Sequence, residues 1–74
     1  MHEFWRDMET GEYWAVELSG GEVTGCAGPL RRGEVSIEYL PDYDYSTFRA
    51  PRLERERGRF TYVPERELLL LDGE

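Results

Sequence analysis

Hydrophobic and polar positions alternate on both sides of a glycine pair between residues 11 and 30. Residues 13–18 place a large apolar set on one face and a mixed set on the other, namely Trp14, Val16 and Leu18 against Tyr13, Ala15 and Glu17. Because only a β-strand places every second residue on one face, residues 11–18 are predicted to form a half-buried strand. Gly20 and Gly21 tolerate the positive φ that a tight hairpin turn requires, so the chain should fold straight back through residues 22–27.

Two further glycines interrupt the returning strand. Gly25 and Gly28 leave gaps in its rows of side chains. A glycine inside a strand is typical of a β-bulge, a sharp bend, or the close approach of another group. Here that group would be the large ring of Trp14 from across the pair. The Gly28-Pro29 dipeptide is expected to end the pairing.

Residues 34–40 alternate in the same way, after a turn at residues 31–33. The apolar and polar sets are Val35, Ile37 and Tyr39 against Glu34, Ser36 and Glu38. This pattern predicts a strand that Pro41 ends, followed by a loop or irregular edge over residues 42–46. Residues 47–57 are mixed, and Pro51 restricts them to the edge of a sheet. Another strand is predicted over residues 59–63.

The segment 64–72 carries signals for two structures. Pro64 with the acids that follow it, and Gly73 at the end, are typical helix boundaries. An isolated helix of about eight residues is marginal, however, and the run Leu68–Leu71 also suits the last strand of a hairpin. We favour the strand, with a short helix as the alternative. Since both faces of such a strand would be apolar, it should lie centrally in the sheet or be buried in a homodimer.

These elements predict an all-β fold in one domain spanning residues 1–74. It would be mainly an antiparallel meander, forming a small curled sheet or open barrel of about five to seven short strands. The alternative is an α+β fold with a short C-terminal helix at residues 64–72. A chain of 74 residues hides only about 60% of its unfolded surface, so the core is thin and a partner subunit would stabilise it.

Charge and composition narrow the possible partners and locations. Sixteen acids against nine arginines, with no lysine, give a net charge of −7. Because phosphate backbones and anionic membranes attract clustered positive charge, neither nucleic acid nor membrane is expected as a direct partner. No signal peptide is recognisable, and Leu68–Leu71 is far shorter than the about 20 residues that span a bilayer. The single Cys26 predicts no internal disulfide and a reducing, cytoplasmic location. The arginine-rich composition is compatible with a thermophilic source.

The residues that could carry chemistry do not form a recognisable catalytic set. Cys26 has no cationic sequence neighbour to hold a thiolate, so it is expected to be a small buried core residue. The only histidine, His2, lies at a terminus expected to fray, which excludes a Cys-His dyad or a Ser-His-Asp triad. Asp42, Asp44 and Ser46 match the first positions of a calcium loop, but its glycine and glutamate are missing. We therefore expect no enzyme, no metal, no cofactor and no small-molecule substrate.

The stretch from Tyr39 to Phe48 carries four aromatic residues in ten, interleaved with aspartates. Tyrosine covers a large contact area while its hydroxyl stays hydrated, so such a stretch is typical of a protein-binding surface. The candidate binding residues are Tyr39, Asp42, Tyr43, Asp44 and Tyr45. In the alternative interpretation Tyr39 and Phe48 belong to the core, while Tyr43 and Tyr45 only cover the rim of the sheet.

The function predicted from these features is a non-catalytic protein-interaction module that binds a protein partner or itself, as a homo-oligomer. The alternative is an acidic nucleic-acid mimic of the phage-encoded type, whose carboxylates imitate phosphates to block a basic protein. On a strand, Asp42 and Asp44 would lie about 6.6 Å apart, close to two phosphate steps. Arginines scattered among the acids weaken a surface of one sign, so mimicry ranks second.

Overall fold

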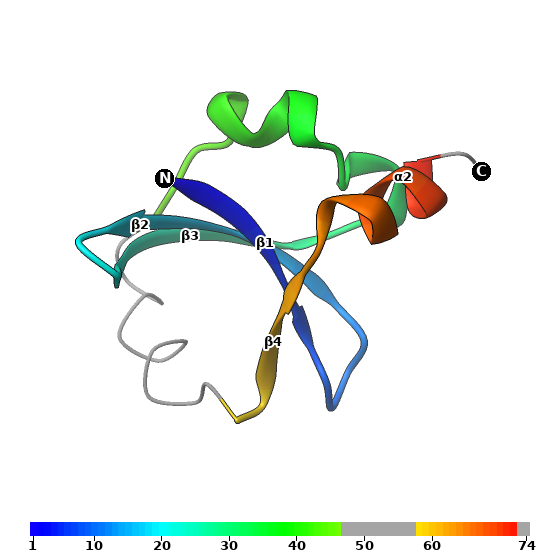
Figure 1. Cartoon of the computed structure of the whole chain (residues 1–74), viewed down its shortest axis with the longest axis horizontal. Helices are drawn as coiled ribbons and strands as arrows, with labels where there is room; N and C mark the ends of the chain where they lie inside the picture. The colour runs from blue at the N-terminus through cyan, green and yellow to red at the C-terminus, as the bar shows by residue number, and fades with distance from the viewer. Residues whose placement is uncertain (47–57, 73–74) are drawn as a thin grey trace.

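The computed structural model describes residues 1–46 and 58–72, and their main feature is one antiparallel sheet (Figure 1). Its four strands are β1 (His2–Asp7), β2 (Tyr13–Ser19), β3 (Glu22–Leu30) and β4 (Phe60–Val63). Their spatial order is β3-β2-β1-β4, and every neighbouring pair is antiparallel. The predicted antiparallel sheet is confirmed, but within the described residues it has fewer strands than expected. Residues 47–57, expected at a sheet edge around Pro51, lie outside the described part.

The predicted hairpin between β2 and β3 is confirmed. Ser19 pairs with Glu22, and Gly20 and Gly21 between them adopt φ values of 58° and 82°. Both central residues of the turn thus have the positive φ that glycine accepts without steric cost.

The two interruptions predicted in β3 are also present. The register with β2 shifts between Glu17 and Leu18, opposite Gly25, and again between Tyr13 and Ala15, opposite Gly28. The pairing was expected to end at Gly28, but it continues to Leu30. Because β3 is an edge strand, Pro29 can stay in it without leaving a neighbouring strand short of a donor.

The strand predicted over residues 34–40 is wrong. The chain forms two short 3-10 helices there, η1 (Arg32–Glu34) and η2 (Ile37–Asp42). Val35 and Leu40 are buried against the sheet, whereas Ile37 and Tyr39 remain exposed. The period of two would place Val35, Ile37 and Tyr39 on one buried face, but packing over the sheet buries Val35 and Leu40 instead.

The favoured strand over residues 64–72 is also wrong, and the alternative helix is present as α2 (Glu65–Asp72). The carbonyl of Pro64 accepts the backbone N–H groups of Glu67 and Leu68 at 3.0 and 3.2 Å. Leu68 joins the core, so tertiary packing stabilises a helix that would be marginal alone. Residues 65–72 therefore do not form the strand that was expected to be central in the sheet or buried in a dimer. In the single chain the side chains of Leu69 and Leu70 are 64% and 75% exposed.

The core has two parts, one on each face of the sheet. One face packs under η1, η2 and α2, which lie together above the sheet in Figure 1, and it contains Phe4, Ala15, Val35, Leu40, Val63 and Leu68. The other face contains Trp5, Trp14, Val16, Cys26 and Phe60. The expected half-buried strand β2 is thus buried on both faces. In the described residues no helix is long and apolar enough to cross a membrane.

Candidate functional site

The aromatic stretch after η2 folds back over the sheet, and two of its tyrosines turn inward. The ring of Tyr43 meets those of Phe4 and Tyr45 edge to face, with centroid distances of 6.1 and 6.4 Å. The hydroxyl of Tyr43 donates a hydrogen bond to the Glu34 carbonyl, and that of Tyr45 donates to the Leu40 carbonyl at 2.7 Å. Both hydroxyls therefore fasten the chain around η2 rather than face a ligand.

The environment of these two tyrosines keeps them protonated. Burial raises the pKa of Tyr43 to about 12, and the nearby Glu34 carboxylate adds to the shift. Burial likewise raises the pKa of Tyr45 to about 12, with Glu17 as the second cause. The ionisation of both hydroxyls is thus displaced further above the physiological pH range, in which they are hydrogen-bond donors.

The stretch then attaches to the edge of β3. Ser46 and Cys26 exchange two backbone hydrogen bonds of 2.8 Å, and Cys26 is buried in the core as predicted. The ring of His2 stacks on Tyr45 at 5.0 Å, and its Nε2 lies 3.3 Å from Glu17 Oε2. The expectation that His2 frays is wrong, because β1 begins at this residue and holds it in the sheet.

Gly25 is the position at which this attachment leaves least room, and its replacement by alanine is expected to lower the free energy of unfolding by about 1–2 kcal/mol. An added Cβ would lie 3.1 Å from the Cβ of Tyr45. Tyr45 cannot move away freely, because its hydroxyl is bonded to Leu40 and Ser46 is paired with Cys26. Urea unfolding followed by circular dichroism measures the effect, and an unchanged midpoint would contradict it.

The structure brings together three of the five predicted binding residues. Tyr39, Asp42 and Tyr43 line one open pocket, together with Gly33 and Glu34. The ring of Tyr39 is 48% exposed, contrary to the alternative interpretation that placed it in the core. Tyr43 and Tyr45 do pack along the rim of the core, as that interpretation expected; Phe48 lies outside the described residues.

The two predicted aspartates lie in different kinds of structure. Asp42 is the last residue of η2, and Asp44 is exposed in the irregular segment that follows. They do not occupy a strand, so the strand spacing that supported phosphate mimicry is absent. Among the described residues, no three His, Cys, Asp or Glu side chains gather in a way that could hold a metal ion.

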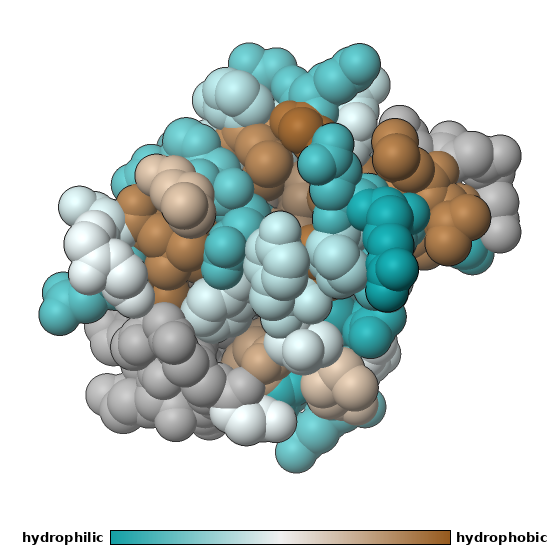
Figure 2. Space-filling view, viewed as in Figure 1, coloured by the Kyte–Doolittle hydropathy of each residue, from teal (hydrophilic) through white to brown (hydrophobic). Residues whose placement is uncertain are grey.

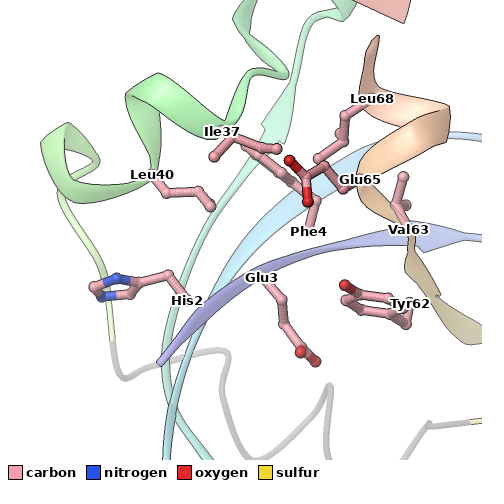
Figure 3. Close-up of a pocket in the computed structure, with 9 residues that line it drawn as sticks. All are labelled: His2, Glu3, Phe4, Ile37, Leu40, Tyr62, Val63, Glu65 and Leu68. Atoms are coloured by element: carbon pink, nitrogen blue, oxygen red, sulfur yellow. The ribbon is translucent and has the colours of Figure 1, made fainter. Parts of the chain in front are cut away.

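A second concave surface, which the sequence analysis missed, lies between η2 and α2 (Figure 3). We define this η2–α2 groove by six of the residues that line it: Phe4, Ile37, Leu40, Val63, Glu65 and Leu68. His2, Glu3 and Tyr62 line it as well. It continues past Ile37 to Ser36, Glu38 and Leu69. Figure 3 shows the Glu65 side chain reaching into the groove from the start of α2. The signal in the sequence was the leucine run, which on a helix turns Leu68 inward and leaves Leu69 and Leu70 outside.

The charges around this groove are only partly compensated. Arg6 pairs with Glu67 on the inner side of α2. By contrast, within the described residues no ion pair involves Glu38, Glu65 or Arg66. The groove thus combines apolar walls with carboxylates that are free to meet a cation.

Comparison with known proteins gives no relative: no family model matches the chain, and no match was found among curated proteins or solved structures. Fold and surface therefore define the protein as a small antiparallel-sheet protein with an apolar groove beside its one described α-helix.

Proposed function

We propose that this protein is a non-catalytic protein-interaction module that docks through the η2–α2 groove and the outer side of α2. The observation that carries the proposal is a cluster of exposed aliphatic side chains. Ile37 is 39% exposed and lines the same stretch of the groove as Leu69, and Leu70 follows directly on α2. Figure 2 shows hydrophobic surface near the C-terminal end of the chain, bordered by hydrophilic side chains.

Single exposed leucines are ordinary, but neighbouring ones beside an apolar groove are typical of an interface. Complete burial of a leucine or isoleucine contributes about 1.5–3 kcal/mol, and the remaining exposed part of each contributes less. Three such side chains therefore give a few kcal/mol, against an association cost of about 4–15 kcal/mol. Polar contacts must supply the rest. The free carboxylates of the groove are available for them, as are Tyr39 and Asp42 in the other pocket.

The proposal is tested by co-precipitation with the tagged full chain, offered both untagged copies and a lysate of the source organism. Ile37→Asp introduces a charge into the groove and should abolish retention of whatever the wild type retains. Met8→Asp is the matched control, because Met8 is exposed in the turn between β1 and β2. Circular dichroism confirms that both variants fold.

Two results would contradict the proposal. The first is a wild-type chain that retains neither a lysate protein nor an untagged copy. The second is an Ile37→Asp chain that retains the same protein to the same extent as the Met8→Asp chain.

A further inference from the structure

We propose that the occupant of the η2–α2 groove is a second copy of this chain, in a dimer with twofold symmetry. In this dimer the outer face of α2 in each copy lies in the groove of the other. The inference rests on the proposed function and names the partner.

The outer face of α2 has the composition that such a contact needs. Arg66, Leu69 and Leu70 follow the spacing i, i+3 and i+4, so they share one face of the helix. All three are exposed, whereas Leu68 on the opposite side is buried. This face therefore presents one cation followed by two leucines one turn later, and nothing in the described part of the chain covers these leucines.

The groove offers the complementary groups. Ile37 and Leu68 provide apolar walls for a leucine, and Glu38 and Glu65 provide carboxylates for a guanidinium. Arg66 cannot use the carboxylate of Glu65 in its own chain well, because adjacent residues on a helix point in different directions. A twofold axis brings each Arg66 to the partner copy's groove, and every contact is then made twice.

The charges of Arg66 and of the groove carboxylates favour a second copy of the chain over a strongly basic partner. A strongly basic partner would match the carboxylates but would leave Arg66 facing a like charge. A second copy places a carboxylate opposite Arg66 and a guanidinium opposite the carboxylates. The net charge of −7 on each chain opposes association at long range. At physiological ionic strength the Debye length is about 8 Å, so the repulsion between distant charges is largely screened, whereas pairs in direct contact are screened less.

The test is sedimentation equilibrium of the full chain at physiological salt, with charge reversals at Arg66 and Glu38. We expect the wild type to dimerise, and R66E or E38R alone to weaken the dimer by about tenfold or more, since each places like charges in contact twice. An equimolar mixture of R66E and E38R should restore the wild-type dissociation constant. In the mixed dimer the acid introduced at position 66 faces the arginine introduced at position 38. The native Glu38 of the first variant faces the native Arg66 of the second.

Glu12→Arg is the matched control, because it makes the same charge change at an exposed position in the β1–β2 turn; it should leave the dimer unchanged. A wild-type chain that stays monomeric at millimolar concentration would overturn the second copy as occupant. The co-precipitation could then still retain another protein, so this failure is distinct from failure of the proposed function. A dimer that ignores both reversals, or a mixture that stays as weak as the single variants, would overturn the proposed arrangement.

Discussion

Replacement of Asp7 by asparagine is expected to lower the free energy of unfolding by about 3 kcal/mol. Asp7 is 2% exposed, and its two carboxylate oxygens accept hydrogen bonds from Nε and Nη2 of Arg59 at 3.0 and 2.8 Å. The same carboxylate accepts the backbone N–H groups of Glu9 and Thr10 at 2.9 and 3.4 Å. Asparagine removes the charge and places an N–H₂ group against one of these donors, so buried hydrogen-bonding groups lose their partner.

The pair also predicts how stability depends on pH. The guanidinium of Arg59 and the backbone N–H groups hold the pKa of Asp7 well below its usual value of 3.8. Between the folded and unfolded pKa values the unfolded chain binds more protons, so this contribution is complete above about pH 5 and declines as the pH falls. The stability difference between wild type and Asp7→Asn should therefore shrink by about 1 kcal/mol from pH 7 to pH 3.

Urea unfolding at the two pH values measures both effects. Glu22→Gln is the matched control, because it makes the same chemical change at an exposed residue of the β2–β3 hairpin, and it should change stability by less than about 0.5 kcal/mol at pH 7. A difference for Asp7→Asn that stays constant from pH 7 to pH 3 would show that the carboxylate titrates alike in the folded and unfolded chains.

The β2–β3 hairpin could be predicted because its turn residues have a local conformational requirement. The structures of residues 34–40 and 64–72 depend on tertiary packing, and the strands predicted for them were wrong. Gly20 and Gly21 require positive φ between two alternating segments, which leaves few alternatives to a tight turn. At residues 34–40 and 64–72 the local pattern was compatible with both strand and helix. Val35 and Leu68 share a core cluster with Phe4 of the sheet, 31 and 64 positions away along the chain, and this packing selected the helical forms.

The sequence was enough to predict which stretch of residues forms the candidate site, but not how their side chains are arranged. The sequence locates the tyrosines, yet the acceptors of Tyr43 and Tyr45 are backbone carbonyls, which carry no signature in a sequence. The Asp7–Arg59 pair joins residues 52 positions apart. It could be recognised only once β1 and β4 were known to be neighbours.

Gly28 lies against the ring of Trp14, which is the close approach predicted for a glycine at this place in the strand. A Cβ at Gly28 would lie 2.7 and 2.8 Å from Cε3 and Cδ2 of Trp14, and 3.1 Å from the Tyr13 carbonyl oxygen. Separations below 3 Å between carbon atoms are repulsive, so the ring or the strand must move. Trp14 is buried among Trp5, Val16 and other core residues and has little room to do so. Gly28 also has a φ of 156°, which residues with a side chain rarely adopt. Gly28→Ala should therefore lower the free energy of unfolding by about 3 kcal/mol, through the clash and the backbone strain together.

A control and a compensating variant separate this clash from a general effect of removing glycine. Gly33→Ala should be nearly neutral, because its Cβ would meet no atom within 4 Å. Trp14→Phe removes Cε3, the nearer of the two ring atoms that the added Cβ would meet, so in that background Gly28→Ala should cost at least about 1 kcal/mol less than in the wild type. Urea unfolding of the four chains of this double-mutant cycle measures the coupling. If the cost of Gly28→Ala is the same in both backgrounds, contact with the Trp14 ring is not the reason for glycine at this position.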